Sequence, residues 1–237
     1  MSEEWGYRLR RFWWGHFSPG VRLTTLIVWS NVAVFAVQLF FHYGLRSERV
    51  DDLFALFPGD LDAGRYWRLV TYAWLHSTTL FLHILFNMTM VYSLGRELEW
   101  PLGTVRFLTL YFGSLIAAAL VWLVWDGRTD AGVEGASGAV FGLLAAYGCY
   151  DPQRVLRVWI MLLIPVTMRA RTLALTIVGF EVVCQFTGWL SGIAHSAHLG
   201  GALFGFLFMK FWHPAKPAPV HTDSFSKEPQ NRPDSTP

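Results

Sequence analysis

The chain has 237 residues, of which 53% are hydrophobic and only 15% are charged. Soluble domains carry about 25% charged residues, so this deficit excludes an ordinary soluble domain and indicates a membrane protein. A formal net charge of +2 excludes the strongly basic surface that a nucleic-acid partner would need. The two cysteines, Cys149 and Cys184, fall in apolar runs predicted to lie at different membrane depths, which argues against a disulfide.

Six apolar runs are candidates for membrane-spanning helices, which need about 20 residues to cross roughly 30 Å of hydrocarbon. They are residues 23–43, 78–98, 103–125, 137–150, 172–190 and 196–212. We therefore expect an all-α fold, a polytopic membrane protein with six transmembrane helices. The membrane domain would cover residues 23–212, between a cytoplasmic juxtamembrane segment at 1–22 and a disordered, proline-rich cytoplasmic tail at 213–237.

The distribution of Lys and Arg predicts the orientation of these helices. With the N terminus on the cytoplasmic side, twelve of the 19 Lys and Arg residues fall in cytoplasmic segments, five fall in external ones, and the last two lie further along the C-terminal tail. This asymmetry is the positive-inside bias, so we expect both termini to be cytoplasmic. The six-helix design and the lack of a transit-like N terminus favour a bacterial plasma membrane. The first apolar run lacks a small-residue cleavage site, so we expect no removed signal peptide.

The external loop at 44–77 is strongly apolar in places, with stretches such as LFALFPG and YWRLVTYAWLH. This composition predicts an interfacial first loop that lies along the membrane surface, anchored by Trp67, Tyr72 and Trp74. An ordinary extramembrane loop is the alternative.

The fourth run is unusually short. Residues 137–150 would form a helix about 21 Å long, ended by Asp151 and Pro152, and the preceding WDGRTDAGVEG is polar and glycine-rich. The polar loop must therefore enter the membrane, which places Ser137 below the outer surface. Irregular backbone is tolerated at that depth only where it is buried in protein or lines a water-filled cavity.

Ser137 has two readings. With Gly138 and Gly142 it follows a small-xxx-small pattern, which is typical of close helix packing in membranes. Alternatively its hydroxyl is a nucleophile, which would require a histidine nearby as a base.

Polar residues on two other helices are predicted at the same depth. His83 and Asn87, spaced i, i+4, share one face near the outer end of the second run. His198 shares a face with Gly201 near the outer end of the sixth. Each of these residues, taken alone, could simply form a hydrogen bond between helices. However, ionisable residues inside the membrane are functional candidates. Together they suit a serine nucleophile, a histidine base and donors for an oxyanion.

With these motifs the sequence resembles the rhomboid intramembrane serine proteases. The matching elements occur in the family's order over about residues 60–205: Trp67–Arg68, HILFN at 83–87, LGRELE ending at Glu99, GASG at 135–138 and AHLGG at 197–201. The resemblance implies a six-helix rhomboid-like bundle, a Ser–His dyad without an aspartate, and no cofactor or metal. It also implies hydrolysis of single-pass transmembrane proteins near the extracytoplasmic membrane face, with membrane lipids as the other partners.

The resemblance also implies a role for each matching residue. Ser137 would be the nucleophile and His198 the general base, with an oxyanion hole formed by His83, Asn87 and the Ser137 amide. Supporting residues would be Phe141, packed on the catalytic histidine, and the close-packing glycines Gly135, Gly138 and Gly201. Arg68 and Glu99 would be structural, the first in the interfacial loop and the second at the inner end of a helix pair.

Two other functions are considered. One is a catalytically silent rhomboid-like protein that binds transmembrane clients, although such relatives usually lack the serine or the histidine that this chain keeps. The other is a metal transporter or zinc protease that uses His76, His83, His195 and His198, although no HExxH motif is present. The role of Glu181 in the fifth run, structural or involved in substrate or proton handling, is left open.

Overall fold

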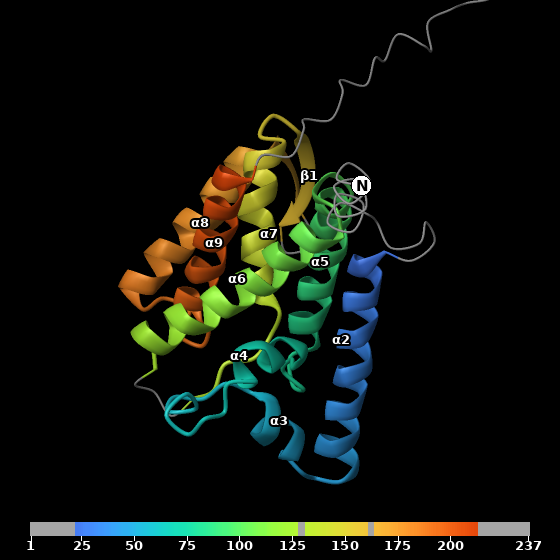
Figure 1. Ribbon diagram of the computed structural model, residues 1–237, viewed down its shortest axis with the longest axis vertical. Coiled ribbons are helices and arrows are strands. Elements are labelled where there is room, and N and C mark those ends of the chain that lie inside the picture. The colour runs from blue at the N-terminus through green and yellow to red at the C-terminus, as the bar shows by residue number, and fades with distance from the viewer. Residues whose placement is uncertain (1–21, 128–130, 161–163, 213–237) are drawn as a thin grey trace, which may run out of the picture.

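The computed structural model describes residues 22–127, 131–160 and 164–212. These residues form a mainly helical bundle (Figure 1). Its elements are α2 (Leu23–Leu39), the π-helical turn η1 (Phe40–Gly44), α3 (Arg49–Phe54), α4 (Arg68–Thr71), the 3₁₀ turn η2 (Tyr72–Trp74), α5 (Phe81–Leu102), α6 (Thr104–Trp125), α7 (Ser137–Tyr150), β1 (Val155–Ile160), β2 (Ile164–Arg169), α8 (Ala170–Thr187) and α9 (His195–Phe211). Nearly all of the expected juxtamembrane segment and the whole expected tail lie outside the described residues.

The six long helices, α2 and α5 to α9, correspond to the six predicted apolar runs. Three of them are long and apolar enough to cross a membrane by length and composition: α2 continued by η1 (Leu23–Gly44), α6 and α8. The other three are shorter or more polar, since α7 has 14 residues, α9 has 17, and α5 carries His83, Asn87 and a charged C-terminal end.

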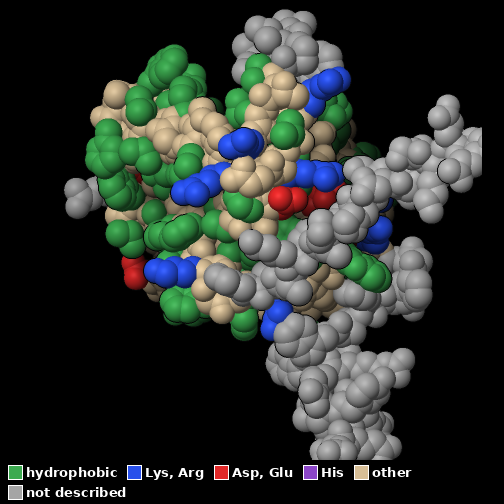
Figure 2. Space-filling view, turned by 90° about the horizontal axis from the view of Figure 1, so that it is seen from above, with side chains coloured by type: hydrophobic (Ala, Val, Ile, Leu, Met, Phe, Trp, Pro, Cys, Tyr) green, Lys and Arg blue, Asp and Glu red, His purple; other side chains and the backbone are tan. Residues whose placement is uncertain are grey.

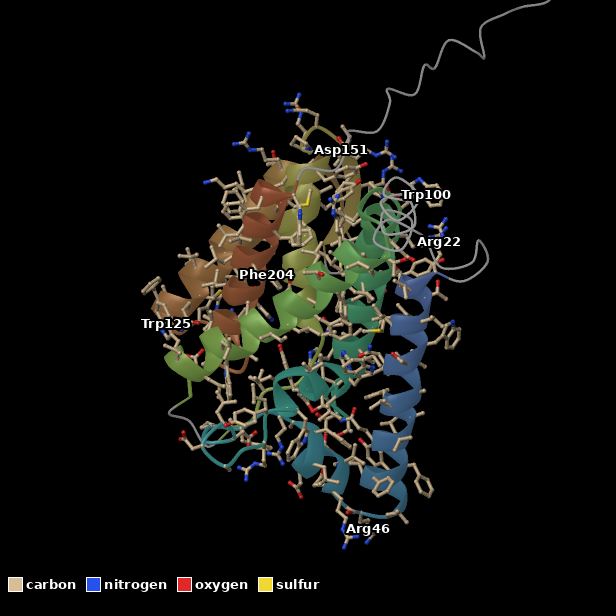
Figure 3. The ribbon with its side chains drawn as sticks, in the orientation of Figure 1. Arg22, Arg46, Trp100, Trp125, Asp151 and Phe204 are labelled. Atoms are coloured by element: carbon tan, nitrogen blue, oxygen red, sulfur yellow. The ribbon has the colours of Figure 1, made fainter. Side chains whose placement is uncertain are left out.

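A short antiparallel hairpin, β1 paired with β2, adds to the expected all-α fold. It links α7 to α8 at the end of the molecule where α2 begins (Figure 1). Arg22 and Asp151 both lie toward this end, and Arg46 lies at the opposite one (Figure 3). Figure 2 looks onto the hairpin end and shows several Lys and Arg side chains gathered there.

Helix α7 is the centre of the bundle and packs against α5, α6, α8 and α9. It approaches α9 so closely that backbone meets backbone, because a Cβ added to Gly201 would lie 2.0 Å from the carbonyl oxygen of Gly138. A Cβ on Gly205 would lie 2.1 Å from the carbonyl oxygen of Gly142. Small residues allow this kind of close contact between membrane helices.

Glu99 joins α5 to the start of α2. Its carboxylate accepts hydrogen bonds from the Leu23 amide (2.7 Å) and from the amide (3.1 Å) and hydroxyl (2.7 Å) of Thr24. The first amides of a helix lack intrahelical acceptors and carry a partial positive charge, so a carboxylate there stabilises the helix. Glu99 therefore acts as a cap for α2, supplied by another helix.

The first loop is folded around Arg68 and Asp60. Both carboxylate oxygens of the fully buried Asp60 accept from Arg68 Nη1, at 2.9 and 3.1 Å, and Arg68 also donates to the carbonyls of Asp52 and Leu53. Burial would raise the pKa of Asp60, but hydrogen bonds from the Phe57 amide, Arg65 and Arg68 outweigh it and hold the pKa below its ordinary value.

The prediction that Tyr72 is an interfacial anchor is wrong. Its side chain is only 1% exposed, and its hydroxyl donates to the Leu115 carbonyl of α6 at 2.9 Å. A tyrosine hydroxyl that finds a buried acceptor has no need of the membrane interface. Trp67, by contrast, is 51% exposed.

Candidate active site

Ser137 is the first residue of α7, the helix that begins in the middle of the bundle. Its Oγ lies 2.9 Å from Nε2 of His198 on α9. The free amides at a helix N terminus and the helix dipole favour negative charge nearby. The serine therefore sits where a base can accept its proton and where backbone amides can stabilise an anion.

The loop that leads into Ser137 is held by the first loop. Leu56 and Val133 exchange two backbone hydrogen bonds, of 3.2 and 2.8 Å, and the Gly135 amide donates to the Tyr72 carbonyl at 3.0 Å. Because Tyr72 is itself bonded to α6, the position of Ser137 is fixed from two sides. Tyr72, which was predicted to lie at the membrane interface, therefore helps to position Ser137.

His198 is buried between α7, α8 and the serine. Its ring stacks on Phe141, one turn after Ser137, with ring centroids 4.2 Å apart and an interplanar angle of 9°. The close approach of α7 and α9 at Gly138 and Gly201 lies beside Ser137 on one helix and one turn after His198 on the other, so it bears on the separation of these two side chains.

His83 and Asn87 on α5 lie next to Gly135. This glycine has φ +111°, and a Cβ there would lie 2.7 Å from His83 Nε2 and 3.6 Å from Asn87 Nδ2. The Ser77 amide donates to His83 Nδ1 at 3.3 Å, so the ring proton is on Nε2 when the histidine is neutral. His83 Nε2–H and the Asn87 amide are thus donors that border the loop two residues before Ser137.

His76 contacts His83 and does not contact Ser137 or His198. The two rings are 5.1 Å apart, and neither ring nitrogen of His76 has a partner among the described residues. Burial, with a contribution from His83, lowers the pKa of His76 to about 3. His76 is therefore neutral in the folded protein above about pH 3.

Glu181 of α8 is a neighbour of His198 that sequence spacing did not reveal. Its Oε2 lies 2.8 Å from His198 Nδ1 and 2.6 Å from His195 Nδ1. His195, three residues before His198 in the chain, is also buried and belongs to the same cluster. No carboxylate lies within one helical turn of these histidines in the sequence, because Glu181 belongs to α8 and the histidines to α9.

Glu181, His195 and His198 are also a possible ligand set for a metal ion, since their ligand atoms lie within 4.8 Å of one another. Transition metals bind such imidazole and carboxylate groups. In the arrangement described, however, both Nδ1 atoms are already hydrogen-bonded to the one carboxylate oxygen and His198 Nε2 to Ser137. The protein's own hydrogen bonds account for the cluster.

Comparison with known proteins indicates the family to which the chain is similar. The family model for the Rhomboid domain matches residues 63–214. The chain is 29% identical over 212 residues to Rhomboid protease AarA of Providencia stuartii, covering 81% of this chain and 73% of that protein. It is 32% identical over 146 residues to RHOMBOID-like protein 5 of Arabidopsis thaliana, covering 62% and 44%.

A third relative is Rhomboid protease GlpG of Yersinia pestis, which is 30% identical over 150 residues, or 62% of this chain and 48% of that protein. The chain therefore spans about half the length of several of the relatives that it matches.

Proposed function

This chain belongs to the rhomboid family, and from that premise we propose that it is an intramembrane serine endopeptidase with Ser137 as nucleophile and His198 as general base. The observation that carries the proposal is the 2.9 Å contact between Ser137 Oγ and His198 Nε2. A serine alone is a weak nucleophile, and a histidine within hydrogen-bond reach is the usual means of activating it.

The reaction follows from this contact. Ser137 Oγ attacks the carbonyl carbon of the scissile peptide bond, while His198 Nε2 takes the hydroxyl proton. The imidazolium then gives that proton to the leaving amine, the carbon–nitrogen bond breaks, and an acyl ester remains on Ser137. Water, deprotonated by His198, adds to the ester, and the breakdown of that second intermediate returns the proton to Ser137 and releases the new carboxyl terminus.

Both tetrahedral intermediates carry an oxyanion that needs hydrogen-bond donors. His83 Nε2–H, the Asn87 amide and the Ser137 backbone N–H are the proposed donors, the first two bordering Gly135. Donors fixed in a site that excludes bulk water stabilise such charge more than donors in water do.

We propose that all six long helices cross the membrane, with the hairpin end facing the cytoplasm. The basic side chains on that end (Figure 2) fit the positive-inside bias. This orientation places the start of the short helix α7 toward the outer leaflet. Single-pass transmembrane proteins would then be cut near the extracytoplasmic face, where the polar loop before Ser137 lets water reach the site.

Cleavage of a model transmembrane substrate by purified protein tests this proposal. Ser137→Ala and His198→Ala are each expected to lower the cleavage rate by about 10³-fold or more. Ser93→Ala, at an exposed position of α5, is the matched control and is expected to cleave at the parent rate. Parent-like cleavage by the Ser137→Ala protein would refute the proposal.

A further inference from the structure

Glu181 is the one carboxylate among the buried residues of α8. The buried positions of α8 are Ala170, Leu173, Ala174, Glu181 and Cys184, which follow one another at helical spacing. Glu181 is 7% exposed. A charged group at such a position costs free energy unless it is paired, and an apolar side chain there would serve packing better. The partners of the carboxylate therefore explain why it is there.

One carboxylate oxygen serves two histidines. Glu181 Oε2 lies 2.8 Å from His198 Nδ1 and 2.6 Å from His195 Nδ1. The Nε2 atom of His195 faces two further acceptors, the carbonyl oxygens of Trp189 (3.2 Å) and Leu190 (3.1 Å). Because carbonyl oxygens only accept hydrogen bonds, His195 Nε2 must carry a proton.

These contacts fix the proton on His198. The hydrogen bond between Glu181 Oε2 and His195 Nδ1 needs one proton, which resides on either of these two atoms. In both cases Oε2 has lone pairs left to accept from His198 Nδ1–H, and the cluster has no net charge. His198 Nε2 is then free of hydrogen and faces Ser137 Oγ at 2.9 Å. This tautomer is the one that a general base needs.

We propose that Glu181 is a positioning residue that completes a Ser137–His198–Glu181 triad in this protein, with His195 holding the carboxylate in place. The inference rests on the proposed serine protease function. Glu181 fixes the tautomer and orientation of His198 and stabilises the imidazolium that forms when Nε2 takes the serine proton. This departs from the family resemblance, which implies a dyad with no carboxylate.

The role of His195 follows from the same contacts. It begins α9, three residues before His198, and binds Glu181 on one side and the carbonyls before α9 on the other. It therefore ties α8 to the start of α9 and sets the direction from which the carboxylate reaches His198. Its ring nitrogens contact no group of Ser137, so it takes no proton in the reaction.

The test compares Glu181→Gln with the parent, with Ser137→Ala and with Glu97→Gln, an exposed carboxylate on α5 as the matched control. Two readouts are needed: the rate constant for labelling by a fluorophosphonate, and kcat and KM for a transmembrane substrate, both per site titrated at saturating labelling. We expect Glu181→Gln to lower the labelling rate constant and kcat by about 10²-fold or more, with KM within about twofold. Glu97→Gln is expected to match the parent.

Glu181→Asp separates positioning from folding. It keeps the charge but withdraws the carboxylate by about one carbon–carbon bond, or about 1.5 Å. We expect a kcat between those of Glu181→Gln and the parent, with unchanged KM. If Glu181→Gln does not fold, the aspartate variant decides, and a parental kcat per titrated site would overturn the inference.

The outcomes distinguish the two levels of the proposal. Parental labelling and kcat for a folded Glu181→Gln protein, with an inactive Ser137→Ala protein, would overturn the triad and leave the protease function standing. Labelling and parent-like cleavage by Ser137→Ala would overturn the assignment of Ser137 as the nucleophile, on which the triad rests.

Discussion

The separation of α7 and α9 at Gly201 can be perturbed by a single methyl group. A Cβ on Gly201 would lie 2.0 Å from the Gly138 carbonyl oxygen and 2.8 Å from its carbonyl carbon. Carbon and oxygen atoms at van der Waals contact are about 3.3 Å apart, so the helices must separate by about 1.3 Å. The obstructing atoms are backbone, and no side-chain rotation can relieve them.

The expected consequence for catalysis follows from that distance. Ser137 is next to Gly138, and His198 is one turn before Gly201, so a shift of this size would stretch the 2.9 Å contact between them beyond hydrogen-bond reach. A misplacement of about 1 Å at reacting groups can cost about 10²-fold in rate. We expect Gly201→Ala to lower the fluorophosphonate labelling rate about 10²-fold and to destabilise the fold by about 1–3 kcal/mol.

The matched control is Gly179→Ala on α8, where an added Cβ meets no atom within 4 Å. Alanine favours a helix over glycine, so this protein should label at the parent rate and unfold at the same or a slightly higher temperature. Labelling rate is measured together with the thermal unfolding midpoint. A folded Gly201→Ala protein that labels as fast as the parent would show that helix separation does not set the catalytic distance.

Three further predictions concern groups around the site. Glu99→Gln should weaken the cap of α2 and so lower the free energy of unfolding by about 1 kcal/mol, which thermal unfolding would measure. The kcat per titrated site should not change. Equal unfolding midpoints for the variant and the parent would contradict the capping role. Phe141→Ala should slow labelling about 3- to 10-fold by removing the ring stacked on His198, whereas Phe141→Tyr should retain the parent rate; equal rates for Ala and Tyr would contradict this. His76 has a pKa of about 3 when folded and about 6.5 when unfolded, so between these values only the unfolded chain binds its proton. The free energy of unfolding should therefore fall by about 1.4 kcal/mol per pH unit as the pH drops from about 6.5 toward 4. This pH dependence should be shallower for His76→Gln, and parallel curves for the two proteins would contradict the assignment.

The helices were the most predictable feature of this sequence because long apolar runs have few alternatives. Helix α7 was anticipated at both ends, since a polar glycine-rich stretch precedes Ser137 and Asp151–Pro152 follows Tyr150. The hairpin at β1 and β2 was not anticipated, because a short run of mixed apolar and basic residues between two membrane helices gives no distinctive signal.

The site was predictable where one helix fixes the spacing and less so where two helices meet. The i, i+4 spacing of His83 and Asn87 and the motif around His198 indicated which residues belong together. The contact of Glu181 with His198 depends on the rotation of α8 about its axis and on which helix packs against it. The periodicity of residues along α8 alone reveals neither of these. The helical spacing of Glu181 with the buried Ala174 and Cys184 was the available signal that it faces the bundle.

The most direct test of the proposed active site is to map the fluorophosphonate adduct by peptide mass spectrometry. The structure predicts one adduct per chain, on Ser137, with much slower labelling when His198 is replaced by alanine. An adduct on another serine, or no adduct on a folded protein that cleaves a transmembrane substrate, would contradict the assignment of Ser137 and His198.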